Sequence, residues 1–208
     1  MWAIVVAGGS GSRFGGPKQF TVLAGRPVVA WSVAAARSVA DGVVLVVPAD
    51  AELPVLDVDQ VVAGGPSRAA SVRAGLAAVP NEADVVIVHD AARPLAMPEL
   101  FAAVLDALDD GVDGAIPVLP VSDTLKRVES GMVRATVDRD GLAMVQTPQA
   151  FVAATLRQAH AGHGEATDDA ALIEALGATV AAVPGDPRNV KLTQPDDLAI
   201  AEALAVAS

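Results

Sequence analysis

Short apolar runs alternate along this chain with longer segments in which apolar and polar residues are mixed. The runs are rich in Val, Ile and Leu and end at Gly, Pro or Asp, which is typical of buried strands. We expect strands at 3–7, 41–48, 60–65, 83–94, 114–121 and 178–184. The segments between them predict helices at 27–40, 67–79, 98–110, from about 152 to 176, and at 194–207. Pro27 and Ser67 suit the first turn and the N-cap of their helices.

The alternation of strand and helix predicts the fold class. Repeated βαβ units give a Rossmann-like α/β fold with a mostly parallel sheet and helices on both faces. Ligands of such sheets bind beyond the carboxyl ends of the strands. Unusual residues gather where three of these strands end: a glycine-rich loop follows the first strand, residues 64–68 stand at the end of the third, and residues 89–94 stand at the end of the fourth. We therefore expect the functional site at this edge.

The stretch 121–151 departs from the pattern because polar and apolar residues alternate in it, with Ser130 and Gly131 as a turn signal. It predicts a β-hairpin outside the main sheet. A two-stranded hairpin is marginal alone, and this one has no core of its own. We expect residues 121–140 to form a protruding β-arm that packs on a second subunit in a homodimer. The alternative is a hairpin folded back on its own domain.

Composition narrows the function classes. At 208 residues, of which 52% are hydrophobic, the chain fits one domain spanning 1–208. With no cysteine, it has no disulfide, thiolate nucleophile or Cys-ligated zinc. The net charge of −11 argues against nucleic-acid binding, although a local cationic cluster can still hold a small anion. The first apolar run is too short to span a membrane and follows no positive segment, so a soluble cytoplasmic protein is expected.

The first loop, within MWAIVVAGGSGSRFGGPKQF, carries the strongest chemical signal. It fits neither the GxGxxG dinucleotide motif nor a P-loop, which needs Gly-Lys-Ser/Thr. It runs from about residue 8 to 27, too long for a plain βα turn. Small residues let a base and ribose approach the backbone, and backbone N–H groups can hold phosphates. Arg13 and Lys18 add positive charge that would stabilise a phosphorus centre in nucleotidyl transfer.

This loop resembles the LxAAGxGxRMxxxxPKQ motif of the pyrophosphorylase-like nucleotidyltransferases. Further blocks follow in the matching order: HDAARP (89–94), SDTLKR (122–127), TVDRDGLAMVQTPQAF (136–151), ATDDA (166–170) and NVKLT (189–193). Together they resemble the cytidylyltransferase family that acts on 2-C-methyl-D-erythritol 4-phosphate in isoprenoid precursor biosynthesis by the non-mevalonate pathway. The resemblance extends from residue 3 to about residue 205.

The resemblance implies a role for each matching residue. Arg13 and Lys18 correspond to the pair that stabilises the transition state, while Arg139 and Lys191 position the acceptor phosphate. The arm would carry Arg139 and Thr124 into the partner's site. The cytosine and ribose pocket is expected at Ala7, Gly8, Gly9, Gly65, Ser71, Asp90 and Ala91, and further acceptor contacts at Thr124, Thr147 and Thr167.

Asp90 is also a candidate to help hold Mg²⁺, which prefers one or two carboxylates together with phosphates. The family often has Gly-Asp where this chain has Gly65-Pro66, and proline offers neither an N–H nor a carboxylate. Several other polar residues have simpler interpretations. His89 is expected to form structural hydrogen bonds. His160 and His163 have the spacing of metal ligands, but we expect them to lie in a flexible loop. Solvent-exposed helix faces are expected for Arg68, Arg73 and Arg157.

The reaction implied is transfer of CMP from CTP to the acceptor phosphate, with release of pyrophosphate. An acceptor phosphate is largely dianionic at neutral pH and needs no general base, which fits the absence of a convincing Ser/His or Cys/His pair. Three alternatives remain: another polyol phosphate such as ribitol 5-phosphate as acceptor, a non-catalytic nucleotide-binding protein, and an oxidoreductase using a dinucleotide.

Overall fold

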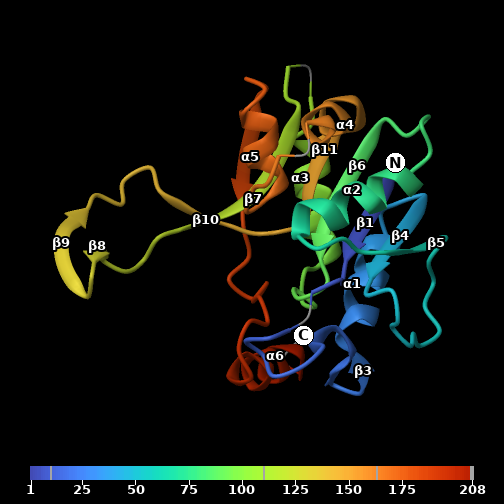
Figure 1. The fold of residues 1–208 in the computed structure, drawn as a ribbon, viewed down its shortest axis with the longest axis horizontal. Coiled ribbons are helices and arrows are strands. Elements are labelled where there is room, and N and C mark those ends of the chain that lie inside the picture. The colour runs from blue at the N-terminus through green and yellow to red at the C-terminus, as the bar shows by residue number, and fades with distance from the viewer. Residues whose placement is uncertain (10, 110, 163, 207–208) are drawn as a thin grey trace.

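One mixed sheet runs through the centre of the molecule (Figure 1). The computed structural model describes residues 1–208 except 10, 110, 163 and 207–208. In these residues eight strands form the sheet, in the order β10-β7-β11-β6-β1-β4-β5 with β12 beside β7. Their bounds are β1 Trp2–Val6, β4 Gly42–Val47, β5 Gln60–Ala63, β6 Val85–Asp90, β7 Gly114–Pro120, β10 Ala143–Val145, β11 Gln149–Val152 and β12 Val180–Pro184.

The central pairings of the sheet are parallel, as the βαβ pattern predicts. Strand β1 lies between β4 and β6, β5 follows β4, and β12 pairs with β7, all in parallel. Strand β11 is antiparallel to both β6 and β7, and β10 is antiparallel to β7. The carboxyl ends of β1, β5 and β6 consequently meet at one edge.

Helices cover both faces, which confirms the predicted layering. Successive residues of β1 point to opposite sides, so Val5 joins a buried cluster with α1 and α3, whereas Ile4 joins one with α2, α4 and α5. Val33 of α1 and Leu76 of α2 are buried in the two clusters. The bounds are α1 Val28–Arg37, α2 Arg68–Ala78, α3 Pro98–Asp106, α4 Ala153–Ala161, α5 Asp169–Glu174 and α6 Asp196–Val206.

A small third cluster lies beside the carboxyl edge. It joins Leu23, Leu192 and Ala201, which are distant in sequence, and Ala201 belongs to α6. Leu23 belongs to the hairpin of β2 (Val22–Leu23) and β3 (Arg26–Pro27), which the sequence pattern did not predict. Through Leu23 and Leu192, this cluster packs the end of the glycine-rich loop against the segment that carries Lys191.

The stretch 121–151 is only partly a separate hairpin. Strands β8 (Leu125–Glu129) and β9 (Met132–Val137) pair with each other and project from the body as the predicted arm (Figure 1). Ser130 and Gly131 form its turn, both with positive φ. The prediction was wrong for the rest, since β10 and β11 join the main sheet. Consecutive Ala150 and Phe151 are both buried, because β11 is covered on both faces.

Candidate active site

A cavity of about 470 Å³ opens at the carboxyl ends of β1, β5 and β6. The loops after these strands and the segment before α6 form its walls, as the rule for parallel sheets predicts. The structure brings ten of the predicted site residues together around it: Ala7, Gly8, Gly9, Arg13, Lys18, Gly65, Ser71, Asp90, Ala91 and Lys191.

The glycine-rich loop folds back on itself next to this cavity. Gly11 has a φ of 66°, and a Cβ there would lie 1.7 Å from the carbonyl oxygen of Gly16, so this position requires glycine. The N–H groups of Phe14, Gly15 and Gly16 all donate to the Gly11 carbonyl oxygen. In this structure these three N–H groups are thus not directed at a ligand, which leaves the earlier part of the loop to approach one.

Lys18 stands in a short 3-10 helix, η1 (Lys18–Phe20), at the end of this loop. Its Nζ donates to the carbonyl oxygen of Leu192 at 2.5 Å. Burial lowers the pKa of Lys18, and the nearby charges of Lys191 and Arg13 lower it further. Three cations thus gather at one side of the cavity in a chain whose net charge is −11.

The opposite wall is the start of α2. Ser67 caps this helix as predicted, with its Oγ accepting from the N–H of Ala70 at 3.1 Å. The Oγ of Ser71 accepts from the N–H of Gly65 at 3.2 Å and donates to the Ser67 carbonyl oxygen at 2.9 Å. These bonds hold the turn at Gly65 and Pro66 against the cavity.

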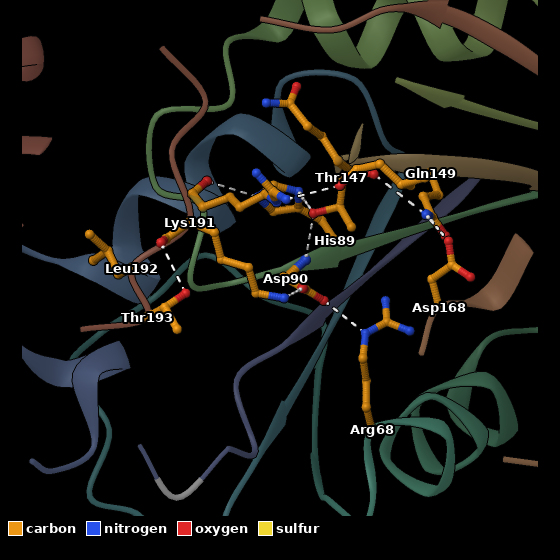
Figure 2. Close-up of polar contacts among 12 residues, drawn as sticks. Arg68, His89, Asp90, Thr147, Gln149, Asp168, Lys191, Leu192 and Thr193 are labelled. Carbon is orange, nitrogen blue, oxygen red and sulfur yellow. Dashed lines mark hydrogen bonds and ion pairs between the residues drawn. The ribbon is translucent and has the colours of Figure 1, made fainter. Parts of the chain in front are cut away.

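Asp90, at the end of β6, lies between two cations that approach it from opposite sides (Figure 2). The Nε of Arg68 donates to Oδ1 at 3.0 Å, and the Nζ of Lys191 donates to Oδ2 at 2.6 Å. Burial alone would raise the pKa of this carboxyl, but the charges of Arg68 and Lys191 hold it well below its usual range. Asp90 is therefore a permanent anion that fixes the positions of both cations.

His89 and Thr147 support Asp90 from inside the sheet. The Nε2 of His89 lies 3.2 Å from the carbonyl oxygen of Arg93, and since a carbonyl only accepts, Nε2 carries the proton. Nδ1 then accepts from the Thr147 hydroxyl at 3.1 Å, and the hydroxyl oxygen accepts from the N–H of Asp90 at 3.1 Å. Burial lowers the pKa of His89 to about 4 and keeps it neutral. This confirms the structural role expected for His89.

A second cavity, of about 260 Å³, adjoins the first. Thr147, Thr167 and Lys191, three of the predicted acceptor contacts, line it together with Arg93 and Asp168. The hydroxyl of Thr147 is bound to His89 and Asp90 rather than directed into the cavity.

Arg93 also lines this cavity, although the sequence pattern assigned it no role, and its side chain donates to the carbonyl oxygens of Asn189 and Val145. Its place in HDAARP, directly after a central strand, was the available signal.

Comparison with known proteins decides the family. The family model described as IspD, 2-C-methyl-D-erythritol 4-phosphate cytidylyltransferase, matches residues 1–206. The chain belongs to this family. A curated relative of that name from Deinococcus radiodurans is 48% identical to this chain. The alignment covers 97% of this chain and 88% of the relative. The crystal structure of the enzyme from Thermus thermophilus superposes with a TM-score of 0.86 at 39% identity, covering 98% of both chains.

Some relatives are longer. The bifunctional enzyme IspD/IspF of Granulibacter bethesdensis is 46% identical over 96% of this chain, which spans 55% of that relative's length. As a member of the IspD family, the chain is a cytidylyltransferase of the non-mevalonate isoprenoid pathway.

Two residues expected from the IspD resemblance lie outside both cavities of their own chain. Thr124 precedes β8 and Arg139 follows β9, on the projecting arm. Arg139 is exposed, and its guanidinium donates to the carbonyl oxygen of Ser122.

Four expectations for other residues were wrong. Arg68 is not a solvent-exposed side chain but binds Asp90 and Asp169, and it lines both cavities. Arg73 donates to the Gly164 carbonyl oxygen and to Glu165. Arg157 donates to the carbonyl oxygens of Leu76, Val79 and Pro80 at the end of α2.

His160 is buried in α4, and its Nε2 donates to Asp169 Oδ1 at 3.0 Å. The three arginines have partners 77 or more residues away except for the Arg68 bond to Asp90, whereas the partner of His160 is nine residues further along the chain, at the start of α5. His163 lies outside the described residues.

The residues around the nucleotide-sized cavity fit a metal ion that is carried mainly by phosphates. Asp90 is the carboxylate that lines this cavity, and both of its oxygens already bind cations. In the part of the chain that the structure describes, no group of three or more His, Cys, Asp or Glu could enclose a metal ion. The described helices are also too short or too polar to cross a membrane.

Proposed function

We propose that the two adjoining cavities hold the two substrates of cytidylyl transfer. CTP occupies the larger cavity and the phosphate of methylerythritol phosphate enters the smaller one. One observation carries the proposal: Arg68, Asp90 and Lys191 line both cavities. The α-phosphorus of CTP and the acceptor phosphate would therefore meet beside these three residues.

The nucleotide would lie along the carboxyl edge of β1 and β6. Ala7, Gly8 and Gly9 leave room for the ribose and base, because larger side chains would fill the cavity. Gly65, with Ser71 holding its N–H, and Ala91 complete the pocket. Pro66 lines it without an N–H donor, so the cytosine would be recognised in this turn through the backbone of its neighbours.

Positive charge supplies the catalysis. As the acceptor phosphate attacks the α-phosphorus in line, negative charge develops on the departing pyrophosphate. Arg13 and Lys18 line the same cavity and would stabilise that charge. Lys191 would neutralise the incoming phosphate, with Thr167 beside it and with Arg139 and Thr124 contributed by an arm. No base is needed, since a phosphate of pKa about 6 is already largely dianionic at neutral pH.

Magnesium fits this arrangement as an ion bound to the triphosphate, with Asp90 as the protein carboxylate closest to it. When bound, it would supply further charge neutralisation at the phosphates. Nucleotidyltransferases generally use this ion. The chain's own cations remain responsible for orienting the two phosphate groups toward each other.

The arm would complete the site of a second subunit in a homodimer. Val128, Met132 and Val133 are 56%, 62% and 64% exposed on the projecting hairpin, and a partner surface would cover them. Mixing two inactive variants, Arg139→Ala and Lys191→Ala, tests this exchange. If arms cross, a mixed dimer has one site with both residues intact, and random pairing restores about one quarter of the activity. If each arm serves its own chain, the mixture stays inactive.

Pyrophosphate release tests the function as a whole. Each of the four nucleoside triphosphates is supplied with Mg²⁺ and with either methylerythritol phosphate or ribitol 5-phosphate. We expect release with CTP and methylerythritol phosphate. Release with ribitol 5-phosphate alone would change the acceptor but keep the chemistry, and no release with CTP and either acceptor would refute the proposal.

A further inference from the structure

Arg68 is the cation at the junction of the two cavities that the family resemblance does not assign. Its guanidinium is a planar fork that must be held at more than one point to keep a fixed orientation. Nε donates to Asp90 Oδ1 at 3.0 Å, and Nη1 donates to Asp169 Oδ2 at 2.7 Å. Burial alone would lower the pKa of Arg68, but the two carboxylates outweigh it and raise the pKa.

The second point of attachment lies outside the site. Asp169 is the first residue of α5, its side chain is 1% exposed, and it lines neither cavity. Its other oxygen accepts from His160 Nε2 at 3.0 Å. A carboxylate bound on both oxygens between α2 and α4 has little freedom, so it can hold Arg68 in one place.

The turn that carries Asp169 also forms the wall of the smaller cavity. Thr167 and Asp168 line that cavity, and Asp168 Oδ1 caps α5 by accepting from the N–H of Ala171 at 3.2 Å. The start of α5 therefore places the acceptor wall and the anchor of Arg68 as one unit. A displacement of this turn would change the orientation of Arg68 toward Asp90.

We propose that Asp169 is a positioning residue for cytidylyl transfer, which acts by holding the Arg68 guanidinium against Asp90 where the two cavities meet. This inference rests on the proposed function. Without Asp169, Nη1 of Arg68 loses its partner, and Nη2 is already buried without one among the described residues. The guanidinium would then turn toward other acceptors and release Asp90, which also holds Lys191.

The variant Asp169→Ala tests the positioning role in the full chain. We expect kcat, measured per CTP-binding site, to fall between about tenfold and a hundredfold, because small misplacements of reacting groups have effects of this size. The dissociation constant for CTP should change less than about threefold, since Asp169 does not line the nucleotide cavity. Asp169→Asn keeps an oxygen for Arg68 and should lose less activity than Asp169→Ala.

Asp113→Ala is the matched control for loss of stability. Asp113 also accepts two hydrogen bonds, from Thr155 Oγ1 at 2.9 Å and the Thr179 N–H at 3.1 Å, but it precedes β7 at the opposite edge of the sheet. We expect it to lower Tm and leave kcat per binding site unchanged. If Asp169→Ala behaves in the same way, the positioning role is wrong.

The double variant Arg68→Ala/Asp169→Ala shows whether Asp169 affects kcat through Arg68 or in some other way. If Asp169 acts through Arg68, its removal changes kcat less than about twofold once Arg68 is gone. If the two losses multiply, the inference is overturned. Should Asp169→Ala fail to fold, the same cycle with Asp169→Asn decides the question. Failure of wild-type protein to release pyrophosphate would refute the proposed function, whereas an active wild type with full kcat in Asp169→Ala would refute this inference alone.

Discussion

Replacing His89 with glutamine removes a buried imidazole that the fold keeps neutral. The ordinary pKa of histidine is 6.5, and burial lowers the pKa of His89 to about 4. The unfolded chain therefore binds a proton at a pH where the native protein does not. Since protons then favour the unfolded state, the free energy of unfolding decreases as the pH falls through this window, by about 1.4 kcal/mol per pH unit.

The stability that neutral His89 contributes is present above its pKa in the unfolded chain, 6.5. It is lost as the pH falls toward its pKa in the folded protein, about 4. Between pH 7.5 and pH 5.0 the predicted loss from His89 alone is about 2 kcal/mol. Glutamine cannot titrate, and its amide can still donate to the Arg93 carbonyl oxygen that His89 binds. Between pH 7.5 and pH 5.0 the free energy of unfolding of the wild type should therefore fall by about 2 kcal/mol more than that of His89→Gln.

Urea unfolding followed by tryptophan fluorescence measures both proteins at each pH. All other titrating groups are shared, so the difference between the two curves isolates His89. The variant is expected to be less stable at pH 7.5, because it loses the bond to Thr147, and the gap should narrow at pH 5.0. A gap that stays constant between these pH values would refute the reasoning.

Three further predictions concern the cavity. Arg13→Ala and Lys18→Ala should lower kcat by at least about a hundredfold with little change in CTP affinity, whereas a raised KM with unchanged kcat would contradict their transition-state role. Gly11→Ala should lower kcat without unfolding the protein, because a Cβ there meets the Gly16 carbonyl oxygen; activity and circular dichroism of the same sample check this. Lys191→Gln should raise the KM for the acceptor far more than that for CTP, and equal effects on both in steady-state kinetics would contradict its placement.

Local pattern was sufficient for the framework of this protein. The buried strands β1, β4 and β6 are short runs rich in Val, Ile and Leu. Such runs can be recognised as strands from the local sequence, whichever strands they pair with. Ser67 could be recognised as an N-cap because a cap depends on residues within one turn. The position of the cavity followed as well, since parallel strands bring their carboxyl ends to one edge whatever their side chains are.

Tertiary structure decided which polar groups meet. Arg68 stands 22 residues from Asp90 and 101 from Asp169, and nothing in the residues around it distinguishes a buried anchor from an exposed helix position. The same holds for β11, whose antiparallel place between β6 and β7 depends on long-range pairing rather than on its own four residues. Periodicity is a local property of the chain, whereas an ion pair or a strand pairing is fixed only when packing brings distant segments into contact.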